Sequence, residues 1–442
     1  MRVPPISSKV SICVAAGMTT SFNDIGSNGV TRHADADRAA AELKSRLKRA
    51  NRISGLKALM LVAPLILFLV ITFLLPIGLL LVRAIDNREV GRVLPTTIEQ
   101  LSAWDMEELP GDAVFQALAS DLKGATRESI AELSKKLNFY SPGFRTLMNR
   151  TMRGVGDLDP ADAKRSLLEI NNAWGDVATW QVIKQASPAL TDHYLLAAVD
   201  LERGPDGSIS GATEDAIYID VILRTLIISF AVTVLCVVIG YPLAYMLATT
   251  DAATARWMMM LVLLPFWTSL LVRTTAWLVL LQSNGVVNSL LSWLGAISDP
   301  LELVHNRTGV LIAMTHILLP FVVLPVHAVM KGIPDVYWRA ASSLGAPDYK
   351  AFLKVYLPLT LPGVGAGALL VFILALGYYI TPALVGGPRD QMLSYFIAYF
   401  VNQTSNWGMA AALAVVLLAF VIGFYLILVF AYGRARAAGA KA

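Results

Sequence analysis

Six long apolar runs dominate this 442-residue chain and limit what it can fold into. A helix needs roughly 20 apolar residues to cross about 30 Å of hydrocarbon, and each run is at least that long. The first run, Ala58–Val82, contains no charged residue, and the second and third contain only Arg224 and Arg273. These lengths predict an all-α membrane protein with six transmembrane helices. The six runs cover residues 58–82 and about 221–249, 257–281, 308–330, 362–385 and 408–432.

The overall composition agrees with a membrane protein and argues against two other classes. Hydrophobic residues make up 56% of the chain and charged residues 15%, against about 45–50% and about 25% in soluble proteins. This balance excludes a disordered chain, and the net charge of +4 is too small to indicate a nucleic-acid partner. The two cysteines, Cys13 and Cys236, cannot form a disulfide framework.

The distribution of lysine and arginine predicts the orientation of the spans, because cytoplasmic loops carry an excess of both. Basic clusters lie before the first run, after the last run and between the fourth and fifth runs. All three positions are cytoplasmic if both termini are cytoplasmic. We expect residues 1–57 to form a cytoplasmic tail whose segment 34–52 is a basic helix on the lipid surface, and residues 433–442 to form a second tail. Residues 10–18 weakly resemble a signal peptide, but polar interruptions favour a loose tail.

Residues 83–219 form an insert between the first two runs that has about the length of a small domain. The insert contains 21 acidic and 14 basic residues, and the predicted topology places it outside the cytoplasm. Its pattern is mostly helical. The helix signals are a capping box at 96–99, a start at Asp159-Pro160, and helical apolar spacing over 122–137, 161–174 and 191–201.

The insert offers little for catalysis. Its one histidine is His193, it contains no cysteine, and no H-E-x-x-H or G-x-S-x-G pattern occurs in it. Its carboxylates are spread along the predicted helices, as on an ordinary solvated surface. We therefore expect no catalytic residue here, and a docking or packing role towards a partner protein is favoured.

The cytoplasmic loop 331–361 carries the most specific pattern in the chain. Residues 335–344 predict a helix with a small-residue face, and Gly345 predicts its end. A second short helix is expected over 348–356, ended by Leu357-Pro358. Two short helices that share a small-residue edge form a knob suited to a groove on another protein.

This loop resembles the cytoplasmic loop of permease subunits of ABC importers. In that family a Glu-Ala-Ala triplet is followed at fixed spacings by Gly, by an aliphatic residue and by Leu-Pro. Arg339 stands where the family has Glu, which puts the ion pair of that Glu with the ATPase in doubt. The matching residues are Ala340, Ala341, Gly345, Val355, Leu357 and Pro358. The resemblance implies that the loop docks onto a separate ATPase subunit.

The resemblance covers about residues 210–432 and is strongest to the spermidine/putrescine-type permeases. The stretches Leu264–Trp277, Leu319–Pro325 and Leu376–Gly387 carry it. It implies a multi-pass permease of the bacterial inner membrane with a second permease subunit, two ATPase copies and a periplasmic substrate-binding protein as partners. The chain has no G-x-x-x-x-G-K-[ST] loop, so ATP and Mg²⁺ are expected on the partner ATPase, with no cofactor in this chain. The long insert is atypical of the family.

Several polar and aromatic residues inside the runs are candidates for the substrate pathway. Arg273 is an ionisable group well inside an apolar run, with snorkelling or an internal anchoring role as the alternative. Aromatic rings can face an organic cation, although such rings more often pack or lie at the membrane interface. The other candidates are Trp267, Trp277, Tyr378, Tyr379 and Thr381. His316 and His327 are expected to pack, and no metal site is expected.

The substrate implied by the resemblance is a polyamine or a related small organic amine. No acidic residue lies near Tyr378, which weakens the case for a polycation and keeps an opine, an amino acid derivative or a betaine open. A secondary transporter would contain buried coupling-ion carboxylates in its spans, and none is evident. A membrane-anchored sensor that uses the insert to bind a ligand remains the alternative from another class.

Overall fold

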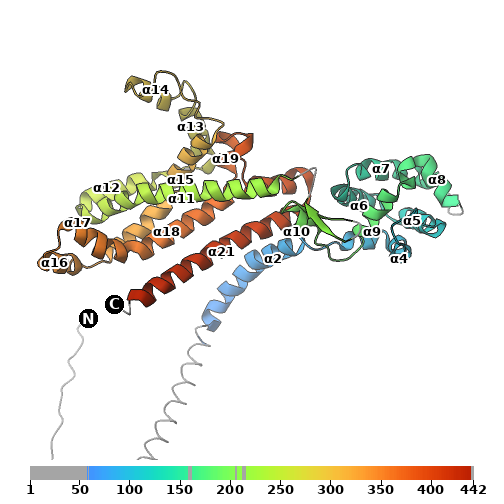
Figure 1. The fold of residues 1–442 in the computed structure, drawn as a ribbon, viewed down its shortest axis with the longest axis horizontal. Coiled ribbons are helices and arrows are strands. Elements are labelled where there is room, and N and C mark those ends of the chain that lie inside the picture. Colours follow the sequence, from blue (N-terminus) through green and yellow to red (C-terminus); the bar gives the residue numbers. More distant parts are fainter. Residues whose placement is uncertain (1–56, 58, 158–161, 205–206, 212–215, 440–442) are drawn as a thin grey trace, which may run out of the picture. The chain divides into compact units, whose positions relative to one another are not determined.

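The computed structural model describes residues 57, 59–157, 162–204, 207–211 and 216–439, and the predicted basic helix 34–52 lies outside them. The chain divides into two compact units, Met1–Pro76 and Ile77–Ala442. In the described part, five helices are long and apolar enough to cross a membrane, and a bent pair of helices makes up to six. The prediction of a helical protein with about six spans is therefore confirmed (Figure 1).

The long helices lie close to the predicted runs, with shifts at their ends. The first candidate span, Leu59–Val82, contains a π turn at Val70–Leu74 followed by α2 (Leu75–Val82). The others are α11 (Tyr218–Thr249), the bent pair Ala252–Trp267 and Leu270–Leu280, α15 (Arg307–Lys331), the helix Asp348–Gly377, and α21 (Trp407–Gly439). The short α14 (Val286–Trp293) lies between the bent pair and α15.

The third predicted run, 257–281, is wrong as a single straight helix. It consists of α12 (Ala252–Leu263), a 3₁₀ turn over Leu264–Trp267 and α13 (Leu270–Leu280), and the two halves meet at 102°. Pro265 has no N–H to continue the helix, and Ser269 begins a new one by accepting a hydrogen bond from the Val272 N–H at 3.2 Å. Proline and cap chemistry therefore override the continuous apolar pattern.

The fifth predicted run, 362–385, is wrong at both ends. The helix starts at α17 (Asp348–Ala351) and continues through a π turn (Phe352–Tyr356) into α18 (Leu357–Gly377). Leu357-Pro358 does not end it, because the Leu357 N–H bonds to the Phe352 carbonyl and Pro358 falls at the start of α18. At the other end Tyr378 is extended, with φ −72° and ψ 128°, before α19 (Ile380–Val385) begins.

Helices α11, α15 and α18 pack side by side and form the apolar core of the membrane-spanning part (Figure 1). Glycines allow the close approach of α18 to α15. A Cβ at Gly363 would lie 2.9 Å from the Val329 Cβ, and a Cβ at Gly367 would lie 3.0 Å from the Val322 Cα. Small residues four positions apart are a common solution for helix contacts in lipid, where van der Waals packing replaces the hydrophobic drive.

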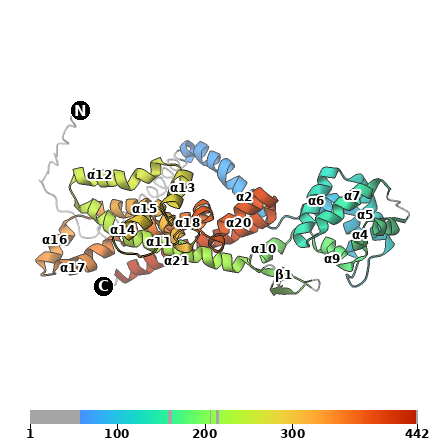
Figure 2. The ribbon, with the colours of Figure 1, turned by 90° about the horizontal axis from the view of Figure 1, so that it is seen from above.

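The insert contains a helical domain, α3 to α9, whose helices cluster together in Figures 1 and 2. Its core contains the fully buried Trp174 and Trp180. The Trp174 indole donates to the Thr151 hydroxyl at 2.9 Å, and the Trp180 indole to the Trp174 carbonyl at 2.9 Å. The helices are α3 (Arg88–Val93), α4 (Pro95–Ser102), α5 (Asp112–Gly124), α6 (Arg127–Tyr140), α7 (Phe144–Gly154), α8 (Ala163–Ile170) and α9 (Val177–Gln185), with 3₁₀ turns at Val155–Asp157 and Asn172–Gly175.

The capping box predicted at 96–99 is wrong, because α4 begins at Pro95 and Thr97 is already helical. The carboxylate of Asp121, from α5, takes over the capping role. It accepts hydrogen bonds from the Thr97 N–H at 2.8 Å, from the Thr97 hydroxyl at 2.7 Å and from the Thr96 hydroxyl. A tertiary contact, which local spacing does not reveal, thus satisfies this helix start.

The other predicted insert helices are shorter than their apolar patterns. The stretch 122–137 is divided after Gly124, and Thr126 caps α6 by accepting from the Ser129 N–H at 3.2 Å. The stretch 191–201 holds only the single-turn α10 (His193–Ala197), followed by a hairpin of β1 (Leu201–Arg203) and β2 (Ile209–Gly211). In the stretch 161–174, α8 ends at Ile170. The start predicted at 159–160 lies outside the described residues.

Tyr194 joins the insert to the beginning of α21. Its ring is 2% exposed and lies against Gly408, where a Cβ would come within 2.7 Å of the Tyr194 Cδ2. On the insert side, the Tyr140 ring stacks on the His193 ring with centroids 4.0 Å apart. Burial raises the pKa of Tyr140 to about 12 and lowers the pKa of His193, so both groups are neutral near pH 7.

The substitution Gly408→Ala tests this junction. The added methyl overlaps the buried Tyr194 ring, and such overpacking destabilises by about 1–3 kcal/mol. We expect the detergent-purified protein to melt several degrees lower than the wild type. Gly423→Ala is the matched control in the same helix, because nothing lies within 4 Å of a Cβ there. Equal melting temperatures for the two variants would contradict the close contact.

Candidate functional site

The loop 331–361 contains a short helix with a sharp end. Helix α16 (Val336–Ser343) is followed by Gly345 with φ +80°, a left-handed conformation that favours glycine. The Gly345 N–H donates to the Ser342 carbonyl at 3.0 Å and the Ala346 N–H to the Ala341 carbonyl at 3.1 Å. This is the Schellman pattern of helix termination, so the prediction that Gly345 ends the first helix is confirmed.

The loop exposes a group of large apolar side chains. Leu344 is 88% exposed, and four others are 49–63% exposed, namely Val336, Tyr337, Tyr349 and Leu353. We call these five residues the loop apolar surface. Among the residues matched to the family pattern, Ala341 is buried, Val355 and Leu357 are half-buried, and Arg339, Ala340, Gly345 and Pro358 are exposed. The five residues of the loop apolar surface come from α16, its C-cap residue, α17 and the π turn after α17, and exposed large apolar side chains in one loop are typical of a protein contact.

The loop is connected to the spanning helices by aromatic contacts. The Trp338 ring packs edge-on to the Tyr356 ring at 6.2 Å, and the Tyr356 ring packs edge-on to the Tyr245 ring of α11 at 5.7 Å. A cavity of about 620 Å³ lies beside these rings, lined also by Met330 and Asp335. The Tyr356 ring therefore connects α16 to the end of α11.

A second group of polar side chains lies where α13, α15 and α19 meet. The Thr274 and Thr381 hydroxyls are hydrogen bonded at 3.1 Å, and both residues are fully buried. The Trp277 indole donates to His316 Nδ1 at 3.1 Å. Three of the predicted pathway residues therefore lie on two helices that contact each other. Arg273 and Trp277 are on α13, and Thr381 is on α19.

Arg273 and Tyr378 complete this polar cluster. Arg273 directly precedes Thr274 on α13, and its Nε atom is buried without a hydrogen-bond partner in the described part of the chain. Tyr378 occupies the break between α18 and α19, where its free carbonyl accepts from the Ser394 hydroxyl of α20 (Leu393–Tyr399) at 2.6 Å. The helix break expected beside Tyr378 and Thr381 is present.

Two predicted pathway residues are not buried with the cluster. Trp267 is 88% exposed in the turn before α13, and Tyr379 is 41% exposed. Arg273 lies on α13, after the 102° bend that separates α12 from α13.

Sequence reasoning missed two features of this region. His316, expected only to pack, contacts the Trp277 indole of another helix. Asp390 is a buried carboxylate in the 3₁₀ turn Pro388–Asp390, where it pairs with Arg307 at 3.3 Å and accepts from the Gly387 N–H at 3.1 Å. It lies between the predicted runs, and its partner is 83 residues away, so a search for acids inside the runs could not find it.

The remaining side chains add no metal chemistry in the described residues. Within them, no group of three or more His, Cys, Asp or Glu side chains is placed to hold a metal ion. His327 lies on α15, as His316 does, and its Nδ1 has no hydrogen-bond partner among the described residues. The described geometry therefore comprises a polar cluster, formed by Arg273, Thr274, Trp277, His316, Tyr378 and Thr381, and a separate loop apolar surface.

Comparison with known proteins places the same region in a family. A family model described as "binding-protein-dependent transport system inner membrane component" matches residues 237–436. The spermidine/putrescine transport system permease protein PotB of Escherichia coli is 32% identical over 203 residues, which cover 46% of this chain and 74% of that protein. The inner membrane ABC transporter permease protein YdcU of Escherichia coli is 35% identical over 215 residues, which cover 45% of this chain and 66% of that protein.

One similar solved structure is that of a bacterial alginate ABC transporter in complex with an alginate pentasaccharide-bound periplasmic protein. The two chains are 19% identical, and their superposition has a TM-score of 0.40. The match covers 49% of this chain and 78% of the other. The family match includes both the loop and the polar cluster, whereas the whole insert 83–219 lies before it. This chain belongs to the family of multi-pass inner-membrane permease components of binding-protein-dependent transport systems, the permease subunits of ABC importers.

Proposed function

We propose that this chain forms half of the substrate pathway of an ATP-driven importer and couples to a separate ATPase through residues 335–358. The observation that carries the coupling proposal is the loop apolar surface, because Leu344 at 88% exposure gains most from burial against a partner. The absence of a P-loop sequence in the chain supports hydrolysis of ATP, with its Mg²⁺, on the partner.

The proposed mechanism follows the contacts of the loop. When the ATPase subunits close on ATP, α16 moves with them, and the Trp338–Tyr356–Tyr245 contacts pass the movement to α11. The spanning helices then open the pathway to the other side of the membrane. In this arrangement two ATPase copies and both termini are cytoplasmic, the insert 83–219 is outside, and a second permease completes the pathway that receives substrate from a binding protein.

We propose a polyamine or a related small organic amine as the substrate. The named function of PotB supports this choice, and so do the aromatic faces of Trp277 and Tyr378, because aromatic rings attract organic cations. Arg273 favours a second candidate class. Its buried Nε has no partner, so it suits the carboxylate of an opine, an amino acid derivative or a betaine better than a polycation.

The docking proposal predicts that Leu344→Asp weakens capture of the ATPase subunit by the detergent-purified permease. Leu344 is exposed and outside the helix core, so this variant folds normally while losing apolar contact. We expect at least about a tenfold loss of affinity, which corresponds to the transfer of one buried leucine. Gly345→Asp has the same effect through a different route, because it strains the φ +80° turn.

Ile209→Asp is the matched control for the docking experiment. It adds the same charge at an exposed apolar position, 54% exposed, in the hairpin of the insert. Its ATPase capture should equal that of the wild type. If Leu344→Asp also captures the ATPase as well as the wild type does, the loop apolar surface is not the docking site.

The substrate proposal predicts that deletion of the gene abolishes uptake of labelled putrescine and spermidine, and that the wild-type gene restores it. Tyr378→Ala should reduce the restored uptake at least about tenfold by removing a cation-facing ring. Tyr425→Ala, at an exposed tyrosine of α21, is the control and should restore uptake fully. Unchanged polyamine uptake on deletion would reject the polyamine. Unlabelled amines, betaines and amino acid derivatives that compete for the remaining gene-dependent uptake would then identify the class.

A further inference from the structure

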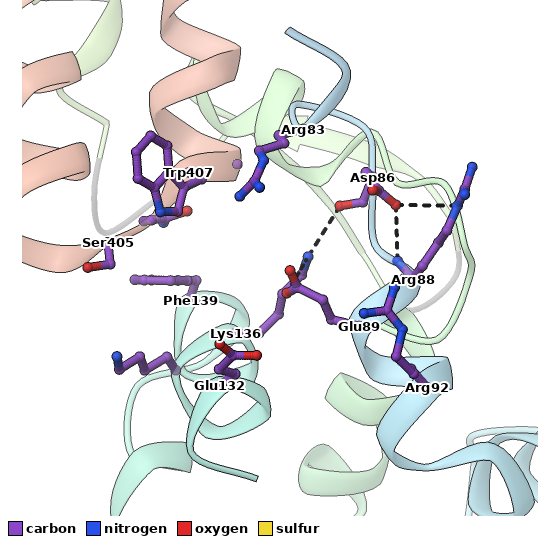
Figure 3. Close-up of a pocket in the computed structure, with 13 residues that line it drawn as sticks. Arg83, Asp86, Arg88, Glu89, Arg92, Glu132, Lys136, Phe139, Ser405 and Trp407 are labelled. Atoms are coloured by element: carbon purple, nitrogen blue, oxygen red, sulfur yellow. Dashed lines mark hydrogen bonds and ion pairs between the residues drawn. The ribbon is translucent and has the colours of Figure 1, made fainter. Parts of the chain in front are cut away.

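A charged cavity of about 380 Å³ lies between the insert and the beginning of α21 (Figure 3). Four segments line it. They are the link after α2, helix α3, helix α6 and residues 405–408, with Phe139 and Trp407 as its aromatic walls. This cavity is separate from the polar cluster, with which it shares no residue.

The charge of this cavity is opposite to that of the insert. Five cations line it, Arg83, Arg88, Arg92, Lys135 and Lys136, against three acids, Asp86, Glu89 and Glu132. Residues 83–219 as a whole contain 21 acidic and 14 basic residues. The cavity is therefore net positive within an acidic insert, and it attracts an anion and repels a polycation.

Two of the three acids are already paired. Asp86 lies 3.6 Å from Arg88, and Glu89 lies 3.4 Å from Lys136. Arg92 and Lys135 make no ion pair with any described residue. Glu132 is the one lining acid without an ion pair in the described part of the chain. The cavity thus keeps donors that can still bind an external anion.

The cavity lies at a boundary between apolar and polar sequence. Arg83 directly follows Val82, the last residue of the first candidate span, and Trp407 is the first residue of the last one. The Arg83 guanidinium lies over the Trp407 ring, 5.6 Å from its centroid. Tryptophan and arginine at the ends of spans lie at the level of lipid headgroups. We therefore expect the cavity to lie at the level of the lipid headgroups, whichever side of the membrane the insert occupies.

An adjoining cavity extends the basic surface. It shares Lys135, Phe139 and Ser405 with the first and adds Arg145, with a volume of about 330 Å³. Arginine and lysine bind phosphate oxygens through charge-assisted hydrogen bonds, and clustered basic residues next to a span attract anionic lipids. The partner chemistry that fits is a phosphate attached to an apolar tail.

We propose that the cavity lined by Arg83, Arg92 and Lys135 binds the phosphate headgroup of an anionic membrane lipid. The bound headgroup neutralises the cluster and ties the insert to the bilayer beside α21. The proposal does not depend on the transported substrate or on the ATPase. It would hold for any function of the permease.

The test measures lipid binding to the full-length detergent-purified protein by native mass spectrometry, with phosphatidylglycerol and phosphatidylcholine in separate titrations. We expect the wild type to bind phosphatidylglycerol at least about tenfold more tightly than phosphatidylcholine. The triple variant Arg83→Gln/Arg92→Gln/Lys135→Gln should lose this preference. Inorganic phosphate is the third arm, and spermidine the fourth, and neither should match phosphatidylglycerol.

The matched control is Arg127→Gln/Arg150→Gln/Arg153→Gln, which removes three exposed cations from α6 and α7 outside the cavity. It should keep the wild-type preference. The single variant Lys135→Gln serves if the triple variant elutes as an aggregate, and a weaker preference is then expected. Equal preference in the wild type and the cavity variant would overturn the proposal. So would its loss in the control, or binding of inorganic phosphate as tight as that of phosphatidylglycerol.

Discussion

The close packing of α15 against α18 is the contact on which the membrane-spanning part depends. In a bilayer, moving an apolar side chain from lipid to a helix interface gains little hydrophobic free energy, because lipid tails are equally apolar. Helices therefore associate where their surfaces approach closely enough for van der Waals packing. Gly363 and Gly367 provide that approach, and α15 also contacts α11, α13 and α19. The helix that carries His316 is thereby fixed in the middle of the fold, and the elements around the polar cluster are positioned against it.

The polar cluster lies where the backbone departs from straight helix. Tyr378 breaks the helix after α18, and the bend between α12 and α13 precedes Arg273 by only a few residues. Unpaired backbone groups at such breaks are expensive in an apolar environment and are tolerated where protein or water satisfies them. The Ser394 hydroxyl does so for the Tyr378 carbonyl. Helix breaks, polar side chains and their partners therefore occur together in this part of the fold.

Much of the fold could be predicted from the sequence, because span length and the glycine stop are local properties. The long apolar runs and the end of α16 at Gly345 are examples. The prediction failed where proline acts in context. Pro265 lies in the turn that ends α12, and Ser269 then caps a new helix. Pro358 instead lies at the start of α18, where the helix continues from a π turn without a break. Hydropathy does not distinguish these two cases.

The contacts that assemble the site could not be predicted for a different reason. The Trp277–His316, Thr274–Thr381 and Arg307–Asp390 pairs join residues 39, 107 and 83 positions apart. Only the packing of the helices brings them together, so residue type identified Arg273, Trp277, Tyr378 and Thr381 as candidates but not their partners. The same holds for the cation-lined cavity, whose walls come from the beginning of the insert, from α6 and from residues 405–408.

In the proposed mechanism, ATP on the side of the loop apolar surface drives substrate through a pathway containing the polar cluster. The most direct test reconstitutes the permease with its second permease, ATPase and binding protein in liposomes and supplies ATP to one side at a time. We expect accumulation of labelled spermidine or another transported amine only with ATP on the side of residues 336–356 and binding protein on the other. Accumulation driven by an ion gradient without ATP would contradict it.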